Sequence, residues 1–172
     1  MDTGVDIQEP APIVSSIEDA EALWFSGALL TILADGEQTG GRFAIVDATL
    51  PEGTSPAWHV QPEDDETFYV LDGEITFWAG DRDQPVRRAT PGTLVSIPRG
   101  TPHSFRVETE TARLLTIHTP AGHERFYRAG GDPAPQRTLP PPGAADIPRL
   151  QAAGRQHAVE FLGPPPTNPE HT

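Results

Sequence analysis

Cysteine and lysine are both absent from the 172 residues. Without cysteine the chain has no disulfide, no thiolate metal ligand and no thiol nucleophile, so any bound metal must be held by nitrogen and oxygen atoms. Without lysine it forms no Schiff base with a carbonyl group, which excludes ordinary pyridoxal-phosphate chemistry. Histidine and the carboxylates are left as the candidates for chemistry at a site.

Positive charge is also scarce, with 12 basic residues against 25 acidic ones and a formal net charge of -13. Such a charge opposes binding to nucleic acid or to anionic lipid, and the arginines show no clustered stripe, so neither is an expected partner. The sequence also has no long apolar run and no signal-like N-terminal pattern, and a cytoplasmic location is expected. A small-molecule partner is therefore favoured.

The length fits one domain, which at this size buries roughly 70% of the surface of its unfolded chain. Residues 1–20 are polar and are expected to form a flexible N-terminal arm. Residues 21–130 hold at least seven short β-forming runs separated by turn signals, which predicts a β-sandwich or barrel that ends in a short helix. Residues 131–172 are expected to form a proline-rich linker, a short helix beginning at Asp146 and a C-terminal tail.

The segment ETFYVLDGEITFW, residues 66–78, predicts a β-hairpin. The Asp-Gly pair at 72–73 favours the positive φ angles of a tight turn, and β-forming residues flank it on both sides. Because side chains alternate along a strand, Glu66, Phe68 and Val70 are expected on one face. A carboxylate thus shares a face with two apolar side chains.

In HSFRV, residues 103–107, a histidine likewise shares a face with two apolar side chains. Strict alternation places His103, Phe105 and Val107 on one side of the predicted strand. A single histidine on an apolar face is usually a hydrogen-bonded core residue rather than a ligand. The spacing of the surrounding residues favours a ligand.

Two spaced motifs, about 20 residues apart, resemble the two motifs of the cupin superfamily. The first consists of Gly53, His59, Gln61, Glu66 and Gly73, and the second of Gly92, Pro98, Gly100 and His103. The resemblance covers roughly residues 22–166 and is to small single-domain bacterial cupins of the quercetin-2,3-dioxygenase-like kind. It implies an all-β double-stranded β-helix, the cupin jelly roll, with short C-terminal helices, and often a homodimer.

The spacing also has a physical interpretation. His59 and Gln61 are two residues apart and point to the same side of one strand, and the loop that follows lets Glu66 return to that side. His103 would come from the opposing sheet. These four side chains are predicted to hold one divalent transition metal, which the sequence leaves open as Fe, Ni, Mn, Co or Zn.

Gln61 departs from the family pattern, which usually has a second histidine at this position. An amide oxygen is a poorer donor to a transition metal than imidazole. Gln61 is therefore a possible ligand, a hydrogen-bond partner of the substrate, or a group that supports the ligands. Glu66 is the expected catalytic residue, although its acidic neighbours at 63–65 also fit a solvated turn.

Phe68, Phe105 and His118 are candidates for a substrate pocket, and His123 is an alternative pocket or helix-capping residue. The resemblance implies a metal-dependent enzyme acting on a small aromatic or enolisable oxygenated molecule, with a quercetinase-like dioxygenase as the first hypothesis. A lyase, isomerase or cyclase would use the metal as a Lewis acid. A non-catalytic cupin that binds a small ligand is the hypothesis that the loss of one histidine favours.

Overall fold

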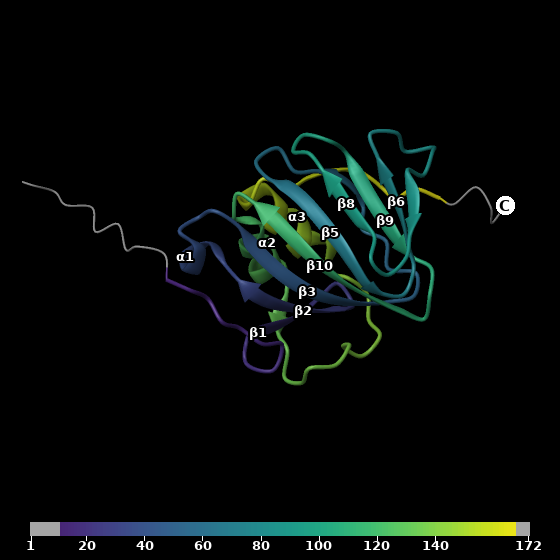
Figure 1. Cartoon of the computed structure of the whole chain (residues 1–172). Helices are drawn as coiled ribbons and strands as arrows, with labels where there is room; N and C mark the ends of the chain where they lie inside the picture. The colour runs from purple at the N-terminus through teal and green to yellow at the C-terminus, as the bar shows by residue number, and fades with distance from the viewer. Residues whose placement is uncertain (1–10, 168–172) are drawn as a thin grey trace, which may run out of the picture.

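Two antiparallel β-sheets pack face to face in the computed structural model, which describes residues 11–167 (Figure 1). The seven-stranded sheet runs in the order β11 (Asp132–Pro133), β1 (Glu21–Phe25), β2 (Ala28–Ala34), β3 (Ala44–Pro51), β10 (Thr111–Thr119), β5 (Asp65–Asp72) and β8 (Leu94–Ile97). The five-stranded sheet runs β12 (Glu160–Gly163), β4 (Trp58–Val60), β9 (His103–Val107), β6 (Ile75–Ala79) and β7 (Arg87–Ala89). The expected all-β jelly roll is confirmed.

Alternation along the strands builds the core between the sheets. On β5, Phe68 and Val70 are buried, whereas Tyr69 faces outward and is 38% exposed. The ring of Phe68 meets that of Phe77 across the sandwich at 5.0 Å between centroids, and Phe77 lies beside Phe105 at 5.8 Å. Aromatic rings at these separations add to the stabilisation that comes from burial alone.

The predicted hairpin at residues 66–78 is wrong. Strand β5 pairs with β10 and β8 in one sheet, and β6 pairs with β7 and β9 in the other, so the chain crosses between sheets at this turn. Gly73 has φ +75°, and Asp72 is not among the residues with positive φ. The same Asp-Gly pair thus turns the chain without pairing its two flanking strands.

Gly73 is required here because the turn passes close to the start of β10. A Cβ atom on Gly73 would lie 2.4 Å from the backbone oxygen of Thr111 and 2.8 Å from the Cα of Ala112. Neither neighbouring atom is on a flexible side chain. The glycine therefore meets both a conformational and a steric requirement.

Gly73→Ala is expected to lower the free energy of unfolding by about 2–4 kcal/mol, the sum of left-handed strain and overpacking. Gly80→Ala is a matched control, since Gly80 has φ +76° but a Cβ atom there would meet nothing within 4 Å. It should cost only about 1–2 kcal/mol. Urea unfolding of both variants measures the difference, and equal losses would show that the approach to β10 is not tight.

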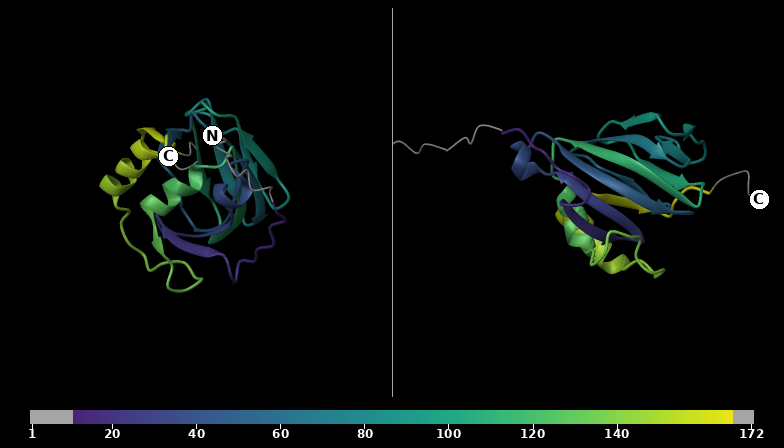
Figure 2. Two further views of the ribbon diagram at one scale, coloured as in Figure 1. Left: turned by 90° about the vertical axis from the view of Figure 1, so that its left-hand side faces the viewer. Right: turned by 60° about the horizontal axis from the view of Figure 1, so that its bottom comes forward.

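Three helices complete the part of the fold that the structure describes: α1 (Gly36–Thr39), α2 (His123–Gly130) and α3 (Ile147–Gln156). As predicted, α3 begins after Asp146, whose side chain accepts a hydrogen bond from the backbone of Arg149. Helix α2 contacts β1 and α3, and α3 contacts β12, so the two helices lie together on one side of the barrel (Figure 2). Within residues 11–167, no helix combines the length and the hydropathy needed to cross a membrane.

The segment that follows residue 130 contributes strands as well as a helix. β11 extends the seven-stranded sheet beside β1, and β12 extends the five-stranded sheet beside β4. Of the expected N-terminal arm, residues 1–10 lie outside the described part of the chain, and residues 11–20 contain no strand. Its flexibility stays a prediction.

The outer face of the seven-stranded sheet carries apolar side chains. Tyr69 and Leu71 on β5 are 38% and 36% exposed, and Leu94 on the adjacent β8 is 60% exposed. Exposed apolar patches on a sheet are a common place for subunit contacts. The face is compatible with the homodimer implied by the sequence resemblance, which stays a prediction.

Candidate functional site

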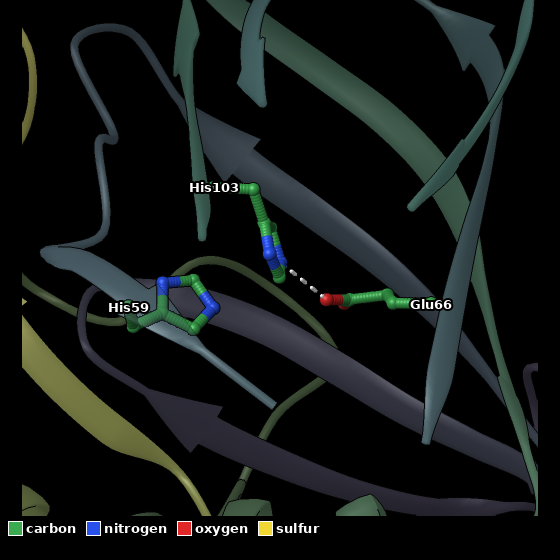
Figure 3. A group of neighbouring side chains, drawn as sticks. All are labelled: His59, Glu66 and His103. Carbon is green, nitrogen blue, oxygen red and sulfur yellow. Dashed lines mark hydrogen bonds and ion pairs between the residues drawn. The ribbon is translucent and has the colours of Figure 1, made fainter. Parts of the chain in front are cut away.

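Three of the four predicted ligands come together between the sheets. His59 on β4 and His103 on β9 are paired neighbours across the five-stranded sheet, and Glu66 reaches them from β5 in the opposite sheet (Figure 3). Their ligand atoms all lie within 4.8 Å of one another. The alternation of β5 turns Glu66 inward, because it shares the buried face of Phe68.

Both histidines are held by the carbonyl groups of nearby backbone. Nδ1 of His59 lies 2.7 Å from the carbonyl oxygen of Ala57, and Nδ1 of His103 lies 2.9 Å from that of Thr101. A carbonyl only accepts, so Nδ1 carries the proton and Nε2 is left for another partner. Nε2 of His103 lies 3.0 Å from Oε2 of Glu66, as the dashed line in Figure 3 shows. Backbone support of this kind is typical of metal-binding histidines.

The pKa values of the cluster follow from burial and mutual charge. Burial raises the pKa of Glu66, but the charges of His118 and His103 and a hydrogen bond from His103 outweigh it, so the net shift is downward. Burial lowers the pKa of His103, but the hydrogen bond and charge of Glu66 raise it more. Burial, then the charge of His103, lower the pKa of His59 to about 4, against opposing contributions from Glu66 and the Gln61 amide. At neutral pH, Glu66 is thus ionised and His59 neutral, the forms that bind metal.

Gln61 lies buried directly after β4, against the ring of His59. Its Nε2 donates to Oδ2 of Asp64 at 2.9 Å, and this hydrogen bond fixes the orientation of the amide. Oε1 is buried without a hydrogen-bond partner in the described part of the chain. An unpartnered buried oxygen is costly, so its position beside His59 fits a fourth ligand to a cation. The residues present therefore fit a metal ion.

A second group of titratable residues lies behind the first. Oδ2 of Asp64 accepts hydrogen bonds from Nε2 of Gln61 and from Nδ1 of His118, each at 2.9 Å. Nε2 of His118 lies 3.7 Å from Oε1 of Glu66, which joins the two groups. His118, expected at the substrate pocket, is fully buried behind the cavity wall.

Asp64, His118 and His123 place three ligand atoms within 4.8 Å of one another, but their geometry does not suit a second metal ion. The rings of His118 and His123 are stacked, 4.3 Å apart at an angle of 9°. Each nitrogen lone pair lies in the plane of its own ring, so two nearly parallel stacked rings do not direct lone pairs at one point. The arrangement suits a hydrogen-bonded network that orients the first group.

A cavity of about 540 Å³ opens onto the cluster of His59, Glu66 and His103, where His59 and Glu66 form part of its wall. Apolar side chains from both sheets and both longer helices form most of its wall, including Phe25, Leu30, Leu50, Phe68, Phe105, Leu114, Phe126, Leu150 and Phe161. The titratable residues of the wall are His59, Glu66, His123 and Tyr127, and its other polar residues are Ser26, Thr54, Ser55, Thr116 and Gln151. Burial raises the pKa of Tyr127 well above its ordinary value, as does the charge of Glu66, so its hydroxyl stays protonated.

Sequence reasoning placed Phe68 and Phe105 at a pocket, and the structure places both on the cavity wall. It missed Asp64, which shares the inward side of Glu66 and Phe68 and could have been found from that alternation. It also missed Tyr127, whose position four residues after His123 puts both on one face of α2. No signal in the sequence points to α3 as part of the wall.

Comparison with known proteins agrees with the motifs. Residues 46–118 match the family described as Cupin domain. Over 122 residues the chain is 30% identical to quercetin 2,3-dioxygenase of Bacillus subtilis (strain 168), covering 71% of this chain and 35% of that protein. The chain belongs to the cupin superfamily. This cupin is also 25% identical over 159 residues to quercetin 2,3-dioxygenase of Aspergillus japonicus, covering 84% of the chain and 45% of that protein.

The chain thus spans less than half the length of both curated dioxygenases. Among solved structures, a predicted oxalate decarboxylase from Thermotoga maritima superposes with a TM-score of 0.57 at 18% identity, covering 63% of this chain and 99% of that one. Identity at this level shows that the cupin fold is shared. It carries no information on the reaction.

Proposed function

We propose that this cupin is a metal-dependent enzyme that acts on a small aromatic or enolisable oxygenated molecule, most simply as a quercetinase-like dioxygenase. One observation carries the proposal: the buried cluster of His59, Glu66 and His103 faces a mostly apolar cavity of about 540 Å³ through His59 and Glu66. Cavities of roughly 300–1,000 Å³ with few polar groups are typical of small-molecule sites. The sequence similarity to two quercetin 2,3-dioxygenases supports the substrate class.

His59, Glu66 and His103 would hold the metal, with Oε1 of Gln61 as the fourth donor. The bound metal supplies Lewis acidity toward an oxygen atom of the substrate. Glu66 lines the cavity and is placed to accept the proton of a substrate hydroxyl group. Phe68 and Phe105 offer aromatic faces to a planar substrate and keep water from its surface.

A lyase, isomerase or cyclase would use the same cavity, with Glu66 moving a proton and without an oxidant. A non-catalytic cupin that binds a small ligand is a second candidate, favoured by one observation. Both protons of the Gln61 amide nitrogen have partners in Asp64 and His123, so this side chain keeps its position without a metal.

The metal content of protein purified without chelator or affinity metal tests the proposal. Mass spectrometry of the elements should find about one equivalent of Fe, Ni, Mn, Co or Zn per chain. Incubation of that protein with quercetin should then consume oxygen in proportion to the flavonol lost. Less than about a tenth of an equivalent after reconstitution would favour the metal-free binding protein, and a full metal site with no oxygen uptake would favour the lyase or isomerase.

Gln61→His is expected to raise metal affinity at least about tenfold, or ~1.4 kcal/mol, because imidazole is the better donor. Gln61→Ala is the paired control and should lower affinity, because it removes the donor without replacing it. Competition with a coloured chelator measures both. If the two variants bind metal as the unsubstituted protein does, Gln61 is not a ligand.

A further inference from the structure

His123 occupies a position that the metal cluster does not explain. It is the first residue of α2, is 5% exposed and lines the same cavity as His59 and Glu66. One face of its ring stacks on His118, and the ring of Tyr127 meets it edge-on at 4.7 Å between centroids. Its orientation is therefore set by packing as well as by hydrogen bonding.

The hydrogen bonds of Gln61 determine which nitrogen of His123 carries the proton. Nε2 of Gln61 lies 2.9 Å from Oδ2 of Asp64 and also 2.9 Å from Nδ1 of His123. Because the carboxylate must accept, the atom facing it is the amide nitrogen, whose second proton points to His123. Nδ1 of His123 then accepts this hydrogen bond. A proton on Nδ1 would point at the N–H of Gln61, and two donors do not form a hydrogen bond. The proton of the neutral ring is on Nε2.

Nε2 of His123 has no hydrogen-bond partner in residues 11–167. Because His123 lines the cavity, this nitrogen is the ring atom left to contact a ligand there. Elsewhere the cavity wall is mostly apolar, and Glu66 offers only acceptors. A donor fixed in this wall is a specific recognition element, because a substrate without a matching acceptor would leave it unpaired.

We propose that His123 is a hydrogen-bond donor to the substrate, with its Nε2–H directed by Asp64 through the amide of Gln61. It recognises a carbonyl or ionised hydroxyl oxygen beside the substrate atom that faces Glu66. This assignment rests on the proposed function for the substrate class, whereas the hydrogen-bond order from Asp64 to His123 stands on the geometry alone. Gln61 thereby serves two neighbours, with its oxygen beside His59 and its nitrogen on His123.

The position of the proton can be measured without substrate or metal. Two-bond ¹H–¹⁵N correlation spectra of the chelator-treated protein should show His123 with an unprotonated Nδ1 and a protonated Nε2. Asp64→Ala removes the acceptor that fixes the amide, and a population with the proton on Nδ1 should then appear. A proton on Nδ1 of His123 in the unsubstituted protein would overturn the proposal.

Binding of quercetin to the purified protein without oxygen, followed by absorbance, tests the substrate contact. His123→Phe keeps a ring of similar size and should weaken binding about tenfold, the effect of one lost hydrogen bond to an ionised group. His157→Phe, the same change at the end of α3 and away from the cavity, should leave binding unchanged. The proposal would be overturned if His123→Phe bound quercetin as the unsubstituted protein does, or if the His123→Phe protein lost its metal.

If the unsubstituted protein holds no metal, the proposed function fails, and the proton position still decides the role of His123.

Discussion

Replacing Glu66 with alanine is expected to abolish metal binding. Glu66 is the one anionic donor in the cluster with His59 and His103, and it is 5% exposed, so its removal leaves a buried ion without a compensating negative charge. Removing groups that merely support a ligand already costs about 10–100-fold in metal affinity, so loss of the charged ligand should cost at least about 100-fold. Elemental mass spectrometry and chelator competition measure the loss.

Two further variants separate charge, shape and location. Glu66→Gln keeps the size of the side chain and should still lose most of the affinity, since the negative charge is what offsets the charge of the ion. Glu63→Ala removes the same charge from an exposed neighbour in the same acidic turn and should leave metal content unchanged. Full occupancy in Glu66→Ala would contradict the ligand assignment.

Phe77→Ala is expected to lower the free energy of unfolding by about 3–5 kcal/mol, the usual cost of removing a buried phenylalanine. Phe77 is 1% exposed and contacts Phe68 from the opposite sheet and Phe105 from the adjacent strand. The loss is a large part of the roughly 5–15 kcal/mol that stabilises a domain. Urea unfolding followed by circular dichroism, with chelator present, measures it independently of metal.

Matched changes test whether packing is the cause. Phe77→Leu conserves most of the volume and should cost under about 1.5 kcal/mol. Val86→Ala, at a position 60% exposed in the loop before β7, should change stability by no more than about 0.5 kcal/mol. If Phe77→Ala proves as mild as Val86→Ala, the contact between the sheets contributes little.

Local patterns in the sequence predicted the strands and their inward faces well. The alternation in residues 66–70 put Glu66 beside Phe68 and Val70, and the structure buries all three. The helix at Asp146 followed from its capping residue and a proline in the first turn. These features depend on neighbouring residues along the chain, so a short segment contains the physical information that determines them.

The pairing of strands was less predictable. An Asp-Gly turn is equally compatible with a hairpin and with a crossing between sheets, because its local geometry does not specify hydrogen-bond partners. Strand β5 joins β10, a strand about 45 residues later, in preference to β6. The choice of partner depends on which arrangement of the strands buries the most apolar surface between the two sheets. That arrangement is a property of the whole chain.

At the candidate site, too, some features follow from the sequence and others only from the tertiary structure. The sequence by itself determined which residues are available for nitrogen and oxygen ligation, and the spacing of His59, Gln61, Glu66 and His103 pointed to one cluster. Only the tertiary structure decided that Gln61 is oriented by Asp64, that His118 lies behind the wall, and that His123 presents a donor to the cavity. Hydrogen-bond direction and cavity shape depend on side chains far apart in sequence, so they become defined when the two sheets and α2 pack together.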